Sequence, residues 1–478
     1  MTQQYKFLVG GEWRTSNKTL PVHFPYTGEV VGEIFLATDQ DIEDAIVAAV
    51  RGFEITRKLP AHARSEVLYN LIAQMEQRRS ELIDVMILEG GKTRNVATGE
   101  SGRAIETVRV AAEEAKRVNG EIVPMDWTAA GEQRQAMVRR VPLGPVLGIT
   151  PFNYPVNLAC HKLAPAIAVG NPFILKPAPD TPLSSVLLME MALAAGYPPE
   201  ALSLIMCRDE QAEEMVKDPR IAFLSFTGSS EVGWYLKGVC GRKRVGLELG
   251  GNAAAIIHED ANVDYAVRRI GVGGFTNAGQ NCISVQRVLI HRPIYDSTLE
   301  KLLARVREIK TGDPREDGIE VGPMINQQGA DKAMSIIQDA VDKGADLLIG
   351  GERDGLMIQP TVLANTTPGM RIRCEEVFGP VITVDAYDDF DEGLRIANET
   401  DYGLQSGIFT QNLNRIMRAF DEIEVGGLQI NDVSTFRVDQ MPYGGVKGSG
   451  VGREGPRYVI EEMTEMKLMV LNLAGGQE

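Results

Sequence analysis

One cysteine of the chain lies in surroundings that suit a nucleophile. Cys282 occurs in the segment GQNCIS, where its neighbours are small or polar. A structural cysteine more often lies among large aliphatic residues, as Cys207 does in SLIMC. A thiolate is an effective covalent nucleophile when nearby groups favour its formation. The pattern therefore indicates Cys282 as a candidate nucleophile and the other four cysteines as structural.

A carboxylate in apolar surroundings offers a candidate base. Glu248 lies between Leu247 and Leu249 in the segment GLELGGN (246–252). Apolar surroundings disfavour the ionised carboxyl and raise its pKa, so such a group can accept a proton near neutral pH. The alternative is a glutamate at a strand edge that points to water.

Three turns at strand ends could hold an anion. The segment FTGSSEVG (226–233) follows an apolar run and opens a helix, where free backbone N–H groups can face a phosphate. A plain turn is the alternative. Lys176 ends the apolar run FILK, so its ammonium group either reaches water or meets an anion. The turn TPFNYPVN (150–157) follows a third run. The five histidines show no metal-ligand spacing, so we predict no metal site.

The elements that must position these residues alternate between strands and helices. Short apolar runs and helical segments follow one another from Gly144 to about Gly250, and again after Asn252. This alternation is typical of doubly wound parallel sheets, which bind ligands at the carboxyl ends of their strands. We therefore expect an α/β fold with two such domains and a site in the cleft between them. We also expect helices over 61–93 and 103–118, a two-stranded hairpin over 120–142 that leaves the main body, and a final strand in the tail.

Composition limits the possible partners and the compartment. The chain has 478 residues, with 49 Lys and Arg against 65 Asp and Glu, for a net charge of −16. This acidity argues against a general nucleic-acid binder but leaves a local anion-binding pocket possible. Five sparse cysteines indicate no disulfide framework and a reducing compartment. No signal-like N-terminus and no apolar run near the ~18 residues that span a bilayer are present. We expect a cytoplasmic protein with no membrane partner.

The order of the motifs resembles that of one enzyme superfamily. PFN, KPA, FTGS, LELGGN, GQNC, EEVFGP and PYGGVKGSG follow one another with the spacing of NAD(P)-dependent aldehyde dehydrogenases. The likeness runs from GGEW near the N-terminus to the last strand. It implies an oxidoreductase that converts an aldehyde to a carboxylic acid with NAD or NADP. It also implies an aldehyde dehydrogenase-like fold with two doubly wound α/β domains and a β oligomerisation arm.

The resemblance divides the chain and implies its assembly. Residues 1–119 and 143–250 would form a Rossmann-like dinucleotide-binding domain, and residues 251–450 the catalytic domain. Residues 120–142 and 458–478 would form the oligomerisation arm of a homodimer or homotetramer.

The resemblance also assigns roles to residues. Cys282 would attack the aldehyde to give a thiohemiacetal, and hydride transfer to the nicotinamide would leave a thioester. Glu248 would activate the hydrolytic water and is a candidate base for Cys282. Asn153 and the backbone N–H of Cys282 would form the oxyanion hole. Lys176 would bind the adenosine ribose, and we include it among both the catalytic and the cofactor-binding residues. The implied cofactor residues are Thr150, Pro151, Phe152, Lys176, Ala178, Pro179, Gly228, Ser229, Val232, Leu249, Gly250, Glu376 and Phe378.

Two departures from the family pattern bear on specificity. Many NAD-preferring members carry an acid three places after Lys176, where this chain has Pro179, so NADP is not excluded. Phosphate-using relatives tend to have arginine just before the nucleophile, where this chain has Asn281. A small anionic or hydroxylated three-carbon aldehyde fits better, of the lactaldehyde, sulfolactaldehyde or glyceraldehyde-3-phosphate type. The branch most resembled is that of lactaldehyde and non-phosphorylating glyceraldehyde-3-phosphate dehydrogenases.

The resemblance implies two arginine contacts with the substrate. Arg103 would line the substrate tunnel and Arg437 would lie at its mouth, unless each forms only a surface ion pair. The alternatives are a CoA-acylating semialdehyde dehydrogenase, which Glu248 argues against, and a non-catalytic cofactor-binding structural protein on the same scaffold. The implied substrate-binding residues are Arg103, Tyr154, Asn281, Ile283 and Arg437.

Overall fold

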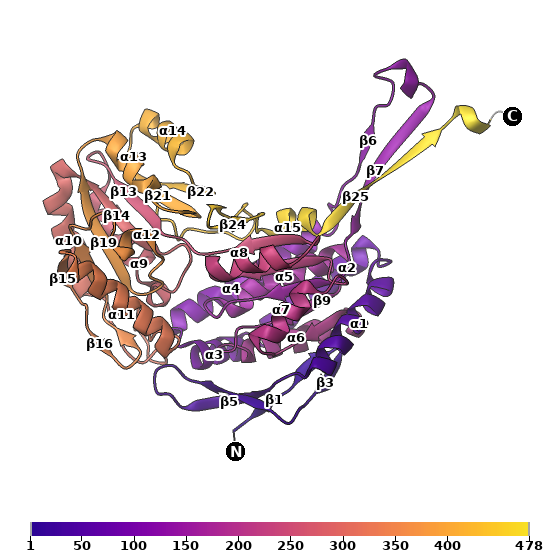
Figure 1. Cartoon of the computed structure of the whole chain (residues 1–478), viewed down its shortest axis with the longest axis horizontal. Coiled ribbons are helices and arrows are strands. Elements are labelled where there is room, and N and C mark those ends of the chain that lie inside the picture. Colours follow the sequence, from indigo (N-terminus) through magenta and orange to yellow (C-terminus); the bar gives the residue numbers. More distant parts are fainter. Residues whose placement is uncertain (1, 477–478) are drawn as a thin grey trace.

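The computed structural model describes residues 2–476 and contains two large sheets, each covered by helices (Figure 1). The first sheet has eight strands, in the order β24-β12-β11-β8-β9-β10-β2-β3. Its five central strands, from β12 to β10, pair in parallel, and the outer strands pair antiparallel. The strands are β2 (Phe7–Val9), β3 (Glu12–Arg14), β8 (Val146–Ile149), β9 (Phe173–Lys176), β10 (Leu202–Leu204), β11 (Phe223–Thr227), β12 (Arg244–Glu248) and β24 (Gly450–Val451).

The first sheet is buried on both faces, as continuous apolar runs such as FILK predict. Phe173 and Leu175 of β9 pack into the core on one face, and Ile174 between them packs into the core on the other. The helices of this domain are α1 (Asp39–Thr56), α2 (Ala61–Gln77), α3 (Arg79–Gly90), α4 (Arg94–Glu114), α5 (Pro155–Val169), α6 (Leu183–Ala194), α7 (Asp209–Lys217), α8 (Ser230–Val239) and α15 (Pro456–Glu462).

The structure corrects two helix predictions. The helix expected over 61–93 is two helices, because Arg78 leaves helical geometry (φ −102°, ψ 19°) between α2 and α3. Its guanidinium group binds Glu81 of α3 and Glu190 of α6. The helix expected over 103–118 is α4, which begins at Arg94, nine residues earlier, and ends at Glu114.

The second sheet has seven strands in the order β15-β18-β19-β14-β13-β21-β22, and only β15 is antiparallel to its neighbour. Two apolar clusters cover its faces, with Ala255 and Ile257 of β13 in one and Ala254 and Ile256 in the other. The strands are β13 (Ala253–Ile257), β14 (Val285–His291), β15 (Asp346–Ile349), β18 (Thr361–Ala364), β19 (Val381–Tyr387), β21 (Gln405–Phe409) and β22 (Gly427–Ile430). The helices are α9 (Val263–Gly273), α10 (Tyr295–Arg307), α11 (Gln327–Asp342), α12 (Arg371–Cys374), α13 (Phe390–Asn398) and α14 (Leu413–Glu422).

A third, three-stranded antiparallel sheet projects from the body (Figure 1). It contains β6 (Glu121–Val123), β7 (Arg134–Pro142) and β25 (Thr464–Asn472), in the order β25-β7-β6. Residues 458–462 belong to α15, which packs on α4 and α5, so the tail joins this sheet only from Thr464. The sheet exposes many large apolar side chains, namely Ile122, Met137, Met466, Leu468, Met469, Val470 and Leu471.

Smaller sheets complete the fold. They are a sheet of β1 (Gln4–Tyr5), β5 (Val30–Phe35) and β4 (Thr19–His23) and the pairs β16 (Arg353–Asp354) with β17 (Met357–Ile358) and β20 (Tyr402–Gly403) with β23 (Val446–Lys447). None of the helices within residues 2–476 is both long enough and apolar enough to span a bilayer.

Candidate active site

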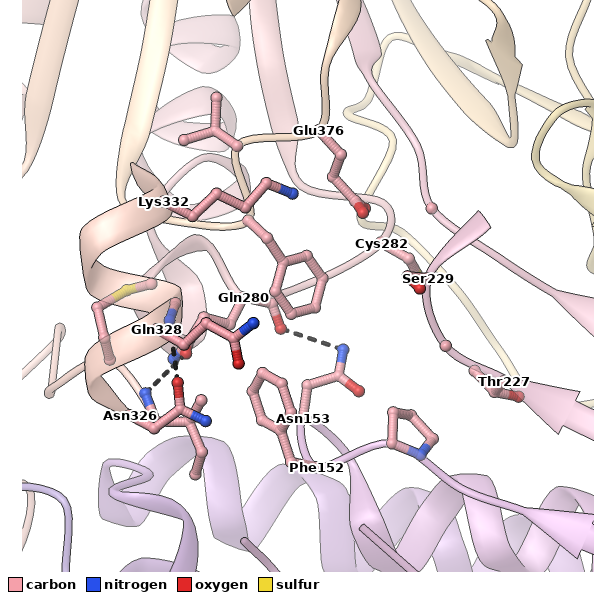
Figure 2. Close-up of a pocket in the computed structure, with 18 of the residues that line it drawn as sticks. Phe152, Asn153, Thr227, Ser229, Gln280, Cys282, Asn326, Gln328, Lys332 and Glu376 are labelled. Atoms are coloured by element: carbon pink, nitrogen blue, oxygen red, sulfur yellow. Dashed lines mark hydrogen bonds between the residues drawn. The ribbon is translucent and has the colours of Figure 1, made fainter. Parts of the chain in front are cut away.

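A cavity of about 330 Å³ lies where the carboxyl ends of the first sheet meet the second domain (Figure 2). Asn153 and Cys282 both face it, as do Phe152, Ser229 and Glu376. Ser229 follows β11 and Phe152 follows β8, as expected for a doubly wound sheet that binds a ligand at its strand ends.

A strained turn places Cys282 in the cavity. Before β14, Asn277 and Ala278 adopt left-handed backbone angles (φ 56° and 55°), which non-glycine residues rarely do. Gly279 follows at φ +68°, and a Cβ there would lie 1.9 Å from the Gly379 carbonyl oxygen. Only glycine fits at this position. Burial raises the pKa of the Cys282 thiol to about 12, so the resting group is a thiol at neutral pH.

Asn153 faces the same cavity as Cys282 and is held by several hydrogen bonds. Its side-chain amide donates to the Gln280 backbone carbonyl oxygen at 3.1 Å (dashed in Figure 2). The backbone carbonyl oxygen of Asn153 accepts a hydrogen bond from the Lys92 ammonium group. Lys92 forms a buried ion pair with Glu100 at 2.7 Å. Glu100 also accepts hydrogen bonds from the backbone N–H groups of residues 156 and 157, at the start of α5. This support fixes the Asn153 segment at the edge of the cavity.

Glu248 is the last residue of β12, and its carboxyl group is buried. The alternative of a glutamate that points to water is therefore excluded. Among the described residues, its Oε2 atom has no hydrogen-bond partner. Burial, and then the negative charge of Glu454, raise the pKa of Glu248 well above its usual value. A carboxyl in this state can take up a proton near neutral pH.

The structure corrects the position predicted for Arg437. It is enclosed rather than located at the mouth of a tunnel, with 6% of its side chain exposed. Its Nη2 atom donates to Glu454 at 2.9 Å and lies 3.0 Å from His161 Nε2. Its Cζ atom lies 3.7 Å from the centre of the Tyr443 ring. Within residues 2–476, its buried Nε atom has no partner, so one donor remains available.

The other predicted substrate residues each have protein partners. Arg103 of α4 is one-third exposed and pairs with Asp439 at 2.8 Å. The Tyr154 ring packs against the Lys92 ammonium group at 4.1 Å. The Asn281 side chain accepts a hydrogen bond from the Ile283 backbone N–H at 3.2 Å. A small apolar cluster contains Ile283, Leu404, Tyr443 and the partly buried Cys282.

The cavity that Asn153 and Cys282 face suits a dinucleotide. The Ser229 side chain caps α8, whose first N–H groups offer a phosphate site. The Phe152 and Phe378 rings stack edge to face, with centres 5.8 Å apart. The Glu376 carboxylate accepts from the Gly251 N–H at 3.0 Å, and burial raises its pKa to about 7. Eight predicted cofactor residues line this cavity: Pro151, Phe152, Gly228, Ser229, Leu249, Gly250, Glu376 and Phe378.

The remaining cofactor residues lie outside this cavity, at or near the same sheet edge. Lys176 ends β9, is buried, and has its ammonium group 3.2 Å from exposed Asp209. Pro179 is exposed, and the neighbouring Asp180 binds the Asn326 side chain at 3.3 Å. Thr150 and Ala178 are buried, and Val232 is exposed on α8.

Several site residues escaped the sequence analysis. Lys332 of α11 extends toward Glu376 from the second domain (Figure 2). The motifs also did not indicate Lys162 and Glu454, which lie beside Glu248, or Lys92, which contacts Asn153. Tyr443, which contacts Cys282, does lie within a motif, PYGGVKGSG. The others stand in no recognisable local pattern.

Known proteins resemble the chain over nearly its full length. The profile described as the aldehyde dehydrogenase family matches residues 13–469. A 3-sulfolactaldehyde dehydrogenase of Priestia aryabhattai is 41% identical, over 98% of this chain and 98% of the relative. Aldehyde dehydrogenase 21 from Physcomitrella patens, solved with the product succinate, is 40% identical with a TM-score of 0.97, and each chain is fully covered. An NADP-dependent glyceraldehyde-3-phosphate dehydrogenase from Bacillus halodurans, solved with NADP, is 34% identical with a TM-score of 0.96, over 98% and 99% of the two chains.

Proposed function

The chain belongs to the aldehyde dehydrogenase family and oxidises small aldehydes with NAD or NADP, and we propose that its substrate is an anionic or hydroxylated aldehyde of three carbons. One observation carries this proposal. A single tyrosine side chain separates Arg437, which has a buried donor without a partner, from Cys282. In a substrate whose carbonyl carbon lies at the Cys282 thiol, an anionic group that reaches Arg437 would therefore be only a few bonds from that carbon.

The geometry supports a two-stage reaction on Cys282. The thiol proton leaves to water, the sulfur bonds to the carbonyl carbon, and the carbonyl electron pair moves to oxygen beside the Asn153 amide and the Cys282 backbone N–H. NAD or NADP, when bound, accepts the hydride that the same carbon releases. Glu248 then takes a proton from water as the water oxygen bonds to the thioester carbon. The carbon–sulfur bond breaks, and the acid leaves with Cys282 restored.

Two observations support a short, anionic substrate. Ile283, Leu404 and Tyr443 form an apolar cluster with Cys282, and these side chains limit the space beside the thiol. Named relatives act on sulfolactaldehyde, sulfoacetaldehyde and glyceraldehyde 3-phosphate, which are all short and anionic. Asn281 in place of an arginine favours a smaller anion than a phosphate.

We expect Arg103→Ala and Arg437→Ala to weaken the use of an anionic aldehyde selectively. A charge-assisted contact in a partly dehydrated pocket contributes roughly 1.5–3 kcal/mol. Each variant should therefore lose about ten- to a hundredfold in kcat/KM, mainly through KM, on a three-carbon aldehyde with a terminal sulfonate. A neutral aldehyde of equal length should be little affected by Arg103→Ala. In Arg437→Ala it should lose less than the anionic aldehyde does, because Arg437 also favours the Cys282 thiolate. Lysine at either position should restore only part of the loss, because its ammonium group cannot form the paired hydrogen bonds of a planar guanidinium group.

Both arginines also pair with carboxylates, so stability must be measured with activity. Removal of Arg437 leaves Glu454 less compensated, whereas Asp439 keeps His161 and Asn157 as partners when Arg103 is removed. Thermal unfolding of each variant separates weaker folding from weaker binding. Equal losses on the charged and the neutral aldehyde would show that the arginines support the fold and not the substrate.

We further propose that the projecting sheet of β6, β7 and β25 is an oligomerisation arm. Its β25 edge is unpaired among the described residues, and an exposed apolar strand edge invites pairing with another chain. Truncation from Met466 onward should dissociate or aggregate the assembly. Light scattering of the intact and the truncated chain tests this proposal, and an unchanged oligomer after truncation would contradict it.

A further inference from the structure

A tyrosine hydroxyl touches the sulfur atom on which the proposed reaction depends. Tyr443 Oη lies 3.0 Å from Cys282 Sγ, and both side chains belong to the small buried cluster around the thiol. Either atom can donate in the resting protein. A phenylalanine at this position would fill the same space without this contact, so packing alone does not require the hydroxyl.

The Tyr443 ring is held on two sides. Its backbone N–H donates to the Glu454 carbonyl oxygen at 3.0 Å, and the Glu454 N–H donates back at 2.5 Å. The Glu454 side chain binds Arg437, whose guanidinium group covers the face of the Tyr443 ring. Gly444 follows at φ +157°, and a Cβ there would lie 2.9 Å from a Glu248 oxygen. The backbone can therefore pass close to the base only with glycine.

We propose that Tyr443 is a catalytic residue, whose hydroxyl donates a hydrogen bond to the Cys282 sulfur when the thiol becomes a thiolate. The inference rests on the proposed role of Cys282 as nucleophile. The thiol proton passes to water, and the Tyr443 hydroxyl turns about its C–O bond so that its own proton points at the sulfur. No proton leaves the tyrosine. The thiolate then attacks the aldehyde carbon as described above.

The charges around the thiol explain why such a donor matters. Glu376 and Glu248 face Cys282 and disfavour its thiolate, while Arg437 and the Tyr443 hydroxyl favour it. The positive charge of Arg437 over the ring makes the hydroxyl a stronger donor. Burial keeps the pKa of Tyr443 well above its usual value, so the phenol retains its proton while the thiol titrates.

The variant Tyr443→Phe tests the proposal on the thiol itself, without substrate. The rate of Cys282 alkylation by iodoacetamide is followed against pH, and peptide mass spectrometry separates this site from exposed Cys374. Removal of one charge-assisted hydrogen bond should raise the pKa of the reaction by about one unit. Alkylation should slow about tenfold at every pH below the pKa of the thiol, neutral pH included.

Two further proteins sharpen the test. In Tyr197→Phe a buried hydroxyl that donates to the Asn171 carbonyl oxygen, away from Cys282, is removed, and the alkylation profile should not change. A fluorinated tyrosine at position 443 donates more strongly and should shift the pKa of Cys282 downward. An unchanged profile in folded Tyr443→Phe would overturn the inference. Near-normal turnover in Cys282→Ala would instead overturn the proposed function, so the two failures are distinguishable.

Discussion

Cys282→Ala is expected to abolish aldehyde oxidation and to leave cofactor binding unchanged. The thiol supplies the only covalent bond between protein and substrate in the proposed reaction, so its loss should lower turnover by at least ~10⁴-fold. The cofactor would be held by other groups, among them Glu376, the start of α8 and the pair of Phe152 and Phe378. Reduced cofactor formation is measured in the presence of aldehyde, and dinucleotide affinity is measured by calorimetry.

Cys374→Ala is the matched control for this experiment. Cys374 is exposed on α12 and takes no part in the proposed chemistry, so its variant should keep normal turnover. Near-normal oxidation by the Cys282 variant would show that another group attacks the aldehyde. Loss of dinucleotide binding together with activity would show instead that the substitution disturbs the cavity.

Glu248→Gln is expected to stop the reaction after its first half. Glutamine preserves the shape of the side chain but cannot accept a proton from water, and general-base catalysis typically contributes ~10²–10⁴-fold. Rapid mixing should show a burst of reduced cofactor close to one equivalent per site, followed by slow turnover. The product of the intact enzyme should be the free acid, and acyl-CoA formation would favour the CoA-acylating alternative.

The pH dependence should change with the same substitution. The base must be ionised to act, so steady-state turnover should fall as the pH drops through the raised pKa of Glu248. The neighbouring Glu454 stays negative over this pH range. Burial raises its pKa, but the positive groups of His161, Arg437 and Lys162 lower it further, to about 2. In Glu248→Gln, the slow turnover after the burst should not show this fall at low pH. A Glu248→Gln variant with full turnover and the same fall at low pH would exclude Glu248 as the base.

Local patterns in the sequence predicted the architecture, which the structure confirms, and indicated candidates for the central residues. Strand–helix alternation predicts doubly wound sheets because each buried strand must carry a continuous apolar run. The turns that follow those runs, with Asn153, Gly228 and Glu248, therefore had to converge at one sheet edge. The glycine-rich turn before Cys282 also has a local cause, since the left-handed angle and close backbone approach at position 279 require glycine.

Contacts between distant segments were decided only by tertiary packing. Cys282 and Tyr443 are 161 positions apart, and Arg103 and Asp439 are 336 positions apart. No periodicity or turn preference relates such pairs, because their proximity depends on how two whole domains pack. The burial of Arg437, which reverses its predicted location, has the same origin. Side-chain type alone indicated which groups could react, and the packed structure determined which of them meet.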